Sequence, residues 1–317
     1  MKTELYTNRS FGIVLVLISG SCWGFHGVII KKAYAVGASF QQVFFAETLF
    51  ASIFFLFFIH SFWRKQRPRT PNQWRDLALC GVASMFVGTF LFLAFSLGPI
   101  AIGATLLFLY MPQVYGYAVF RGIQSFSYLK TFSIGLLLIG AGATTNILGA
   151  LNGDGYTGAI LAALAASTSY AIIFLLTPRL SAFTSATFRS FSVSFICFLG
   201  SGSMLLALPF MRNQEPIEWL PFVGLAIVLG LVGQTIPVIT LMKGIPIVGS
   251  SIAGALASIE LPVAVISSAI FLGETVTITQ SLGVALVFIG ILLFNLPTQN
   301  AERKPEVETP WIPKRSL

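Results

Sequence analysis

The sequence predicts an all-α integral membrane protein of ten transmembrane helices, arranged as two inverted repeats of five helices each. Three observations predict this fold class. The 317-residue chain is 56% hydrophobic and only 9% charged, its apolar residues form ten runs of membrane-spanning length, and its two halves resemble each other. A soluble domain has roughly 25% charged residues, so this composition favours lipid as the solvent of the outer surface.

Ten segments are long and apolar enough to span, since crossing the hydrocarbon takes about 20 residues in helix. The third and fourth segments are separated only by the turn at Gly98 and Pro99. We expect the spans at residues 11–31, 39–62, 77–97, 99–120, 130–149, 156–177, 186–210, 218–242, 248–272 and 276–296.

The basic residues predict the orientation, because cytoplasmic loops carry an excess of Lys and Arg. With the amino terminus inside, all but three of the 19 Lys and Arg residues are cytoplasmic, the exceptions being Lys31, Lys32 and Arg212. We therefore expect a multi-pass protein of the cell (inner) membrane with both termini in the cytoplasm. Because the basic residues follow this topology, the net charge of +8 does not indicate a nucleic-acid partner.

The two halves repeat at a nearly constant offset. Gly12-x-x-Leu15 recurs as Gly158-x-x-Leu161, Gly135-x-x-Leu138 recurs as Gly283-x-x-Leu286, and Pro112 answers Pro262. The expected boundaries are residues 1–149 for the first repeat, 150–296 for the second and 297–317 for a cytoplasmic tail. An odd number of spans in each repeat inverts the second one, and inverted repeats are typical of secondary transporters.

Two stretches carry a resemblance to a known family. Gly20-Ser-Cys-Trp23-Gly24 is followed by Lys31, and Glu260-Leu-Pro262 is followed by Leu272-Gly273-Glu274 and Gln280-x-x-Gly283. Through these motifs residues 11–296 resemble the drug/metabolite transporter superfamily, specifically its EamA-like ten-helix members. The resemblance implies a transporter rather than an enzyme, which exports or imports a small metabolite such as an amino acid or a drug-like compound. The sequence departs from the family where Glu47 stands in place of a frequent arginine.

Two acidic residues, Glu47 and Glu260, lie well inside expected spans. A charge at that depth costs at least ~2.5–3.5 kcal/mol on insertion scales, so it usually faces a cavity or a partner. We interpret both residues as proton carriers or as counter-charges for a cationic group of the substrate. A structural ion pair is the alternative, and Lys31 is a candidate partner as well as a candidate substrate-binding residue.

The first span places His26 on one helix face with Ser19 and Trp23, at spacings of i, i+4 and i+7. A histidine there can titrate near neutral pH and couple transport to protons, or it can be a hydrogen-bonded packing residue. Trp23 and its repeat counterpart Tyr170 are candidates for substrate binding, with core packing as the alternative.

The fourth span has a polar-aromatic face formed by Tyr110, Gln113 and Tyr117 at i, i+3 and i+7. These side chains are candidates for substrate binding. Pro112 lies beside them, and a proline within a span frees a carbonyl that a neighbour, a water or a ligand must satisfy.

Pro112, Pro237 and Pro262 are therefore interpreted as hinges or markers of the site, with ordinary kinks as the alternative. Gln234 lies one turn before Pro237 and is a candidate to contribute its amide to the substrate site.

We expect no cofactor and no metal. The sequence lacks a G-x-x-x-x-G-K-[ST] loop for ATP, and Cys22, Cys80 and Cys197 lack the spacing of metal ligands. The expected function is a secondary carrier that holds its substrate between the first, fourth, sixth and ninth spans. A channel-like facilitator or a membrane receptor without coupled transport is the alternative. The substrate, the direction of transport, proton coupling and a homodimeric state stay open.

Overall fold

The structure, a computed structural model, describes residues 2–59, 67–97, 100–145, 156–207, 216–273 and 275–296. These residues form helices joined by short turns. The expected tail at 297–317 and Glu274 of the family motif lie outside the described residues.

The first half contains five spans, the fourth of which is divided into two half-helices. Its helices are α1 (Lys2–Ala35), α2 (Phe40–Ile59), α3 (Pro71–Leu97), α4 (Ile100–Leu107), α5 (Tyr110–Phe120) and α6 (Tyr128–Thr145).

The second half repeats this arrangement, with a divided helix as its fourth span. Its elements are α8 (Thr157–Ser181), α9 (Ala186–Ala207), α10 (Trp219–Val228), the π-helical segment η2 (Leu229–Thr235), α11 (Ile236–Val248), α12 (Ser250–Ala257), α13 (Glu260–Leu272) and α14 (Ile278–Asn295). α10, η2 and α11 follow one another directly and form a single span, Trp219–Val248.

The all-α membrane fold with two halves of five helices is confirmed. Among the described residues, nine segments are long and apolar enough to cross a membrane. The tenth helix is α6, whose 18 residues include Lys130 and several hydroxyl side chains that make it less apolar. Two helices begin earlier than expected: α1 begins at Lys2 rather than at residue 11, and α3 begins at Pro71 rather than at residue 77. Within the added part of α3, the charge of Asp76 is paired with Arg179 of α8.

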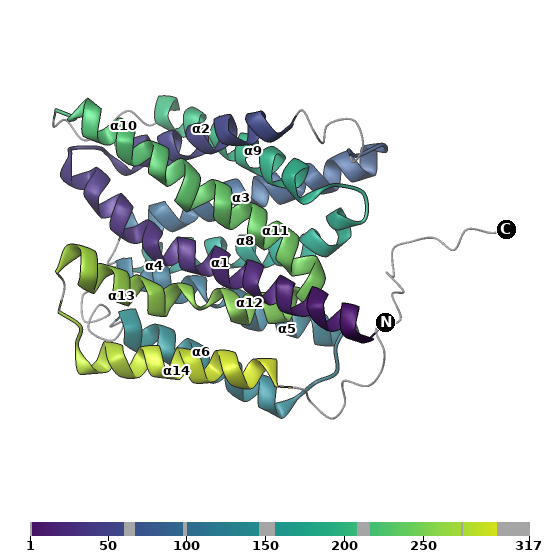
Figure 1. Cartoon of the computed structure of the whole chain (residues 1–317). Coiled ribbons are helices and arrows are strands. Elements are labelled where there is room, and N and C mark those ends of the chain that lie inside the picture. Colours follow the sequence, from purple (N-terminus) through teal and green to yellow (C-terminus); the bar gives the residue numbers. More distant parts are fainter. Residues whose placement is uncertain are drawn as a thin grey trace.

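The two halves are interleaved rather than placed side by side. α6 lies along α14, α2 along α9, α3 along α8 and α1 along α11, so each of these contacts joins one helix of each half (Figure 1). The beginning of α1 and the end of α14 lie at the same end of the bundle (Figure 1), as an even number of crossings requires. Five spans per half therefore give the second half the opposite direction to the first.

The divided helices lie at equivalent places in the two halves. α4 gives way to α5 at residues 108–109, and α12 gives way to α13 at residues 258–259. Pro112 and Pro262 follow these breaks and cannot donate to the carbonyls of Phe108 and Ser258. Tight turns satisfy both carbonyls instead, through Met111 N at 3.1 Å and Leu261 N at 3.1 Å. Proline chemistry thus produces the same interruption twice.

Glycine allows the closest helix contact, between α6 and α14. A Cβ atom added at Gly140 would lie 2.8 Å from the Gly283 carbonyl oxygen, so the two backbones touch. Small residues that let backbones approach are typical of helix interfaces in membranes.

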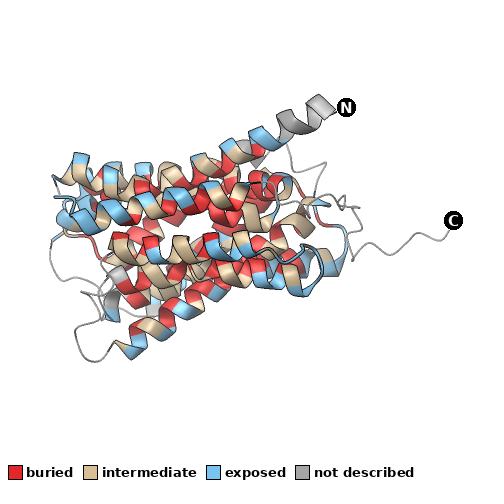
Figure 2. Cartoon of the chain, turned by 90° about the horizontal axis from the view of Figure 1, so that it is seen from below, coloured by how far each residue is buried: buried red, intermediate tan, exposed pale blue. Residues whose placement is uncertain are grey.

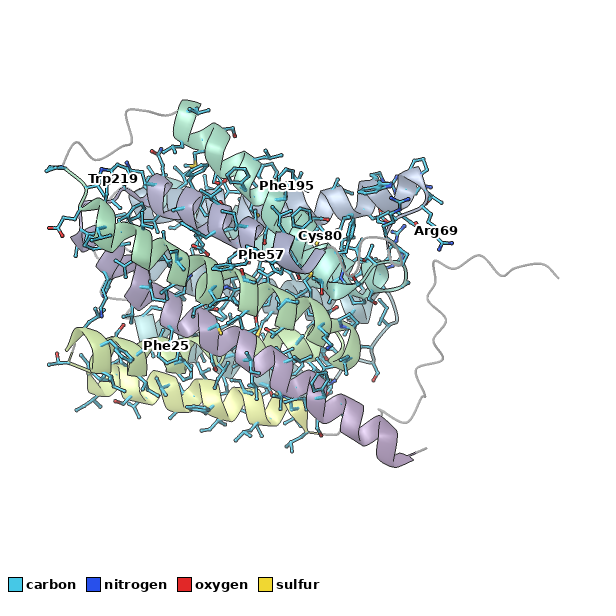
Figure 3. All side chains as sticks on the ribbon, turned by 45° about the horizontal axis from the view of Figure 1, so that its top comes forward. Phe25, Phe57, Arg69, Cys80, Phe195 and Trp219 are labelled. Carbon is cyan, nitrogen blue, oxygen red and sulfur yellow. The ribbon has the colours of Figure 1, made fainter. Side chains whose placement is uncertain are left out.

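Burial is greatest along the middle of the bundle, whereas exposed residues lie on its outer faces and at its ends (Figure 2). Large apolar side chains such as Phe57, Phe195 and Trp219 are exposed on that surface (Figure 3). An outer surface of this kind suits lipid, where such side chains cost nothing.

Candidate functional site

A cavity of about 440 Å³ lies inside the bundle. Its lining comes from both halves, with residues from α1, α2, α3, α4, α6, α8, α9, α11, α13 and α14. The volume falls in the range of about 300–1,000 Å³ that is usual for small-molecule sites.

The cavity reaches the surface at one end of the bundle. Thr144 and Thr145, the last residues of α6, line it there together with Thr275 and Val276, which are exposed between α13 and α14. This end is opposite to the one at which α1 begins (Figure 1).

The lining stops before the other end of the bundle. On α3 it begins at Ser84 and on α8 it ends at Ile173, about 9–12 Å along each helix from Asp76 and Arg179 at 1.5 Å per residue. The Asp76 carboxylate is buried, with Arg179 Nη2 at 2.9 Å and Arg75 Nη2 at 3.3 Å. This ion pair joins α3 to α8 beyond the floor of the cavity.

His26 on α1 and Glu47 on α2 form a pair in the cavity wall. The distance from His26 Nε2 to Glu47 Oε2 is 2.9 Å, and Glu47 is only 3% exposed. Gly233 lies directly against the pair: a Cβ atom added there would be 2.7 Å from His26 Cδ2 and 3.0 Å from Glu47 Oε1. The absence of a side chain at residue 233 is therefore what makes room for the pair.

Trp23 lines the cavity one turn before His26 and donates a hydrogen bond to a carbonyl that lacks its usual helical donor because of a proline. Pro237 has no N–H for the carbonyl of Gly233 four residues earlier, and Trp23 Nε1 donates to that oxygen at 2.9 Å. Ser19 Oγ donates in turn to the Pro237 carbonyl at 2.9 Å. The face shared by Ser19, Trp23 and His26 is thus directed at η2 and the start of α11.

Gln234 lies in η2, lines the cavity and donates weakly to Ser194 Oγ at 3.4 Å. A π-helical turn within a longer helix is frequent at functional sites, because it presents backbone and side chains that a regular α-helix would not.

Glu260 lies at the first residue of α13, directly after the break in the ninth span, and faces the cavity. Tyr170 also lines the cavity, with its ring 6.1 Å from Trp23 in an edge-to-face arrangement. Tyr110, the repeat counterpart of Glu260, is buried behind Tyr170 with the ring centroids 4.6 Å apart. The Tyr110 hydroxyl donates to the Gly254 carbonyl at 2.8 Å, so it supports the wall rather than lining it.

Six of the residues singled out from the sequence thus line the cavity: Trp23, His26, Glu47, Tyr170, Gln234 and Glu260. The others lie elsewhere. Gln113 donates to Ser167 Oγ at 3.0 Å, whereas Tyr117 and Lys31 are exposed. Pro112, Pro237 and Pro262 adjoin helix interruptions rather than the cavity surface.

Sequence reasoning missed three residues of interest: Asp76, Arg189 and Gly233. Asp76 and Arg189 lie near helix ends, where a charge resembles loop composition, yet Arg189 is only 2% exposed. Gly233 could have been identified from the sequence, because it stands four residues before Pro237 and its carbonyl therefore lacks the N–H that residue 237 would otherwise donate.

A model described as the EamA-like transporter family matches residues 10–145 and 157–296. No curated protein matches the chain. Among solved structures, one titled only "Crystal structure of protein" is similar, at 16% sequence identity and a TM-score of 0.68, over 91% of this chain and 97% of that chain. At this identity the likeness concerns the fold alone.

Proposed function

Because the chain belongs to the EamA-like transporter family, we propose that it is a secondary carrier that moves a small metabolite across the cell membrane by alternating access. The family comprises membrane transporters of small molecules, not enzymes. One observation carries the proposal: the cavity lies between the two halves, reaches exposed residues at one end and stops short of the ion pair of Arg179 with the buried Asp76 at the other.

The repeat supports alternating access. Two copies of one fold in opposite orientations can exchange their shapes, so that a cavity open at one end becomes open at the other. The breaks at residues 108–109 and 258–259 are equivalent in the two copies and adjoin the cavity at Phe108 and Glu260. Rotation of the half-helices about these breaks, together with separation of Asp76 from Arg179, would open the second end.

The proposed substrate site comprises Trp23, His26, Tyr170 and Gln234, with Glu47 and Glu260 as counter-charges or proton carriers. Apolar walls with a few convergent polar groups are typical of small-molecule sites. A metabolite such as an amino acid or a drug-like compound suits the size of this cavity.

The proposed orientation has both termini in the cytoplasm. Arg69 lies at the end of the bundle where α1 begins, whereas Trp219 lies at the opposite end (Figure 3). The basic residues at the ends of α3, α5, α6 and α8 fall at the same end as Arg69 by alternation of the spans. The positive-inside rule then assigns that end to the cytoplasm, and the cavity opens to the outside.

Counterflow in proteoliposomes tests the proposal. We expect saturable exchange of one or more compounds from a panel of amino acids, nucleobases and amines, and we expect it to disappear in Glu260→Gln. Glu218→Gln is the matched control, since Glu218 begins the turn into α10 and does not line the cavity. Absence of flux across the panel would refute the carrier, and flux that does not saturate would favour a channel-like facilitator.

Proton coupling is part of the proposal, because His26, Glu47 and Glu260 place titratable groups on the cavity wall. A carrier whose counter-charges bind protons in one half of the cycle moves substrate at a rate that depends on the pH difference between the two sides. We therefore expect an imposed pH gradient to change the initial rate of uptake. An unchanged rate at equal substrate concentrations would indicate facilitated exchange instead.

A further inference from the structure

Acidic side chains outnumber basic ones on the cavity wall. Two carboxylates, those of Glu47 and Glu260, and one imidazole, that of His26, face the cavity. The described lining includes no lysine or arginine, although the chain has 19 of them. An anionic ligand would therefore meet negative side chains without a full positive charge to balance it.

Two basic residues on helices that line the cavity already have other partners. Arg189 donates to the carbonyl oxygens of Thr184 and Met242, both at 2.6 Å. Arg179 is paired with Asp76 at 2.9 Å. Neither guanidinium lines the cavity, so neither supplies a site for a carboxylate or a phosphate there.

The two carboxylates differ in what they already contact. Glu47 is hydrogen-bonded to His26, which offsets part of its charge. Glu260 forms none of the ion pairs among the described residues, which are those of Glu47 and Asp76. Glu260 is therefore the carboxylate that is left to face a ligand.

Aromatic rings complete the wall around these carboxylates. Trp23, Tyr170, Phe44 and Phe108 all line the cavity. The Trp23 ring is fixed in position by the bond from its Nε1 to the Gly233 carbonyl and by its edge contact with Tyr170. Aromatic faces attract cations, most strongly where water is excluded. The rings and the carboxylates of the wall therefore both favour a positively charged ligand.

From this combination we infer that the cavity selects substrates with a cationic amine on an apolar or aromatic body, and that it discriminates against carboxylates. The inference rests on the proposed transport function and specifies its substrate class. Glu260 supplies the counter-charge, and the rings hold the rest of the molecule.

Three probes with one phenol body and different charge test this: tyramine, which is a cation, tyrosine, which is a zwitterion, and 3-(4-hydroxyphenyl)propionate, which is an anion. Binding to the purified full-length protein is measured by calorimetry, and transport by counterflow. We expect tyramine to bind about ten-fold or more tightly than the propionate, because a single close charge pair in a protein of effective dielectric about 20 supplies at least that much. Tyrosine should lie between them.

Variants identify the source of the preference. Glu260→Gln should remove most of the difference between tyramine and the propionate, whereas Glu260→Asp and the control Glu218→Gln should preserve it. Binding of the propionate as tight as that of tyramine, or no binding of any probe, overturns the inference. If tyramine binds selectively but none of the three crosses the membrane, the substrate class stands and the carrier function fails. If the propionate is carried as well as tyramine, the carrier stands and the substrate class fails.

Discussion

Gly233→Ala is expected to reduce counterflow about ten-fold or more while the protein stays folded. The added methyl group would lie 2.7 Å from His26 Cδ2, 2.8 Å from His26 Nε2 and 3.0 Å from Glu47 Oε1. These distances are below van der Waals contact, so both side chains have to shift, which disturbs the hydrogen bond between them. A hydrogen bond to a charged group contributes about 1.5–3 kcal/mol, and each 1.4 kcal/mol is about a factor of ten.

Gly224→Ala in α10 is the matched control, because an added Cβ atom there meets nothing within 4 Å. Alanine has a higher helix propensity than glycine by about 1 kcal/mol, so this variant should be as stable as the parent and fully active. Thermal unfolding in detergent, run beside the flux assay, separates a local effect from loss of the fold. Equal activity of Gly233→Ala and the parent would show that the His26–Glu47 pair does not require the glycine.

The fold was largely predictable from the sequence, because the bilayer imposes it. Apolar runs of about 20 residues leave helix as the available conformation, and the twin positions of Pro112 and Pro262 point to the two breaks that divide the fourth and ninth spans. The sequence did not predict the rotation of each helix about its own axis, which decides which side chains face the interior. Tyr117 shares a helix face with Tyr110 by spacing, yet Tyr117 is exposed and Tyr110 buried, because lipid and interior are both apolar and hydrophobicity does not separate one face from the other.

The candidate site could be predicted only in part. Glu47 and Glu260 stand out in the sequence because an acidic residue in an apolar run is costly. The partners of these residues were not predictable, since the pairing of His26 with Glu47 depends on how α1 and α2 meet at η2. Pro178, Pro237 and Pro246 each lack the N–H that a carbonyl four residues earlier would otherwise accept. The donors that replace these N–H groups come from other helices and could not be read from the sequence: Ser250 donates to Phe174, Trp23 to Gly233, and Arg189 to Met242.

The last of these contacts predicts the largest change in stability. Arg189 is 2% exposed and donates to the Met242 carbonyl, which lacks its usual helical donor because residue 246 is a proline without an N–H. Arg189→Met removes this donor and the one to Thr184, and leaves buried carbonyls without partners at about 1–3 kcal/mol each. We expect a destabilisation of about 2–4 kcal/mol, seen as a lower thermal midpoint in detergent. Arg69→Met makes the same chemical change at an exposed position and should stay within about 0.5 kcal/mol of the parent.

A double-mutant cycle with Pro246→Ala distinguishes this mechanism from simple loss of a large side chain. Alanine at residue 246 restores an N–H group four residues after Met242, so the carbonyl regains a partner within α11 whether or not Arg189 is present. Arg189→Met should therefore destabilise the Pro246→Ala protein less than it destabilises the parent. The difference between the two losses of stability should exceed about 0.3–0.5 kcal/mol, the range within which the effects of independent mutations are additive. Equal costs in the two backgrounds would mean that Arg189 stabilises the bundle by packing or charge alone. A reduced cost would establish that an arginine from α9 takes the place of the backbone donor that the proline removed from α11.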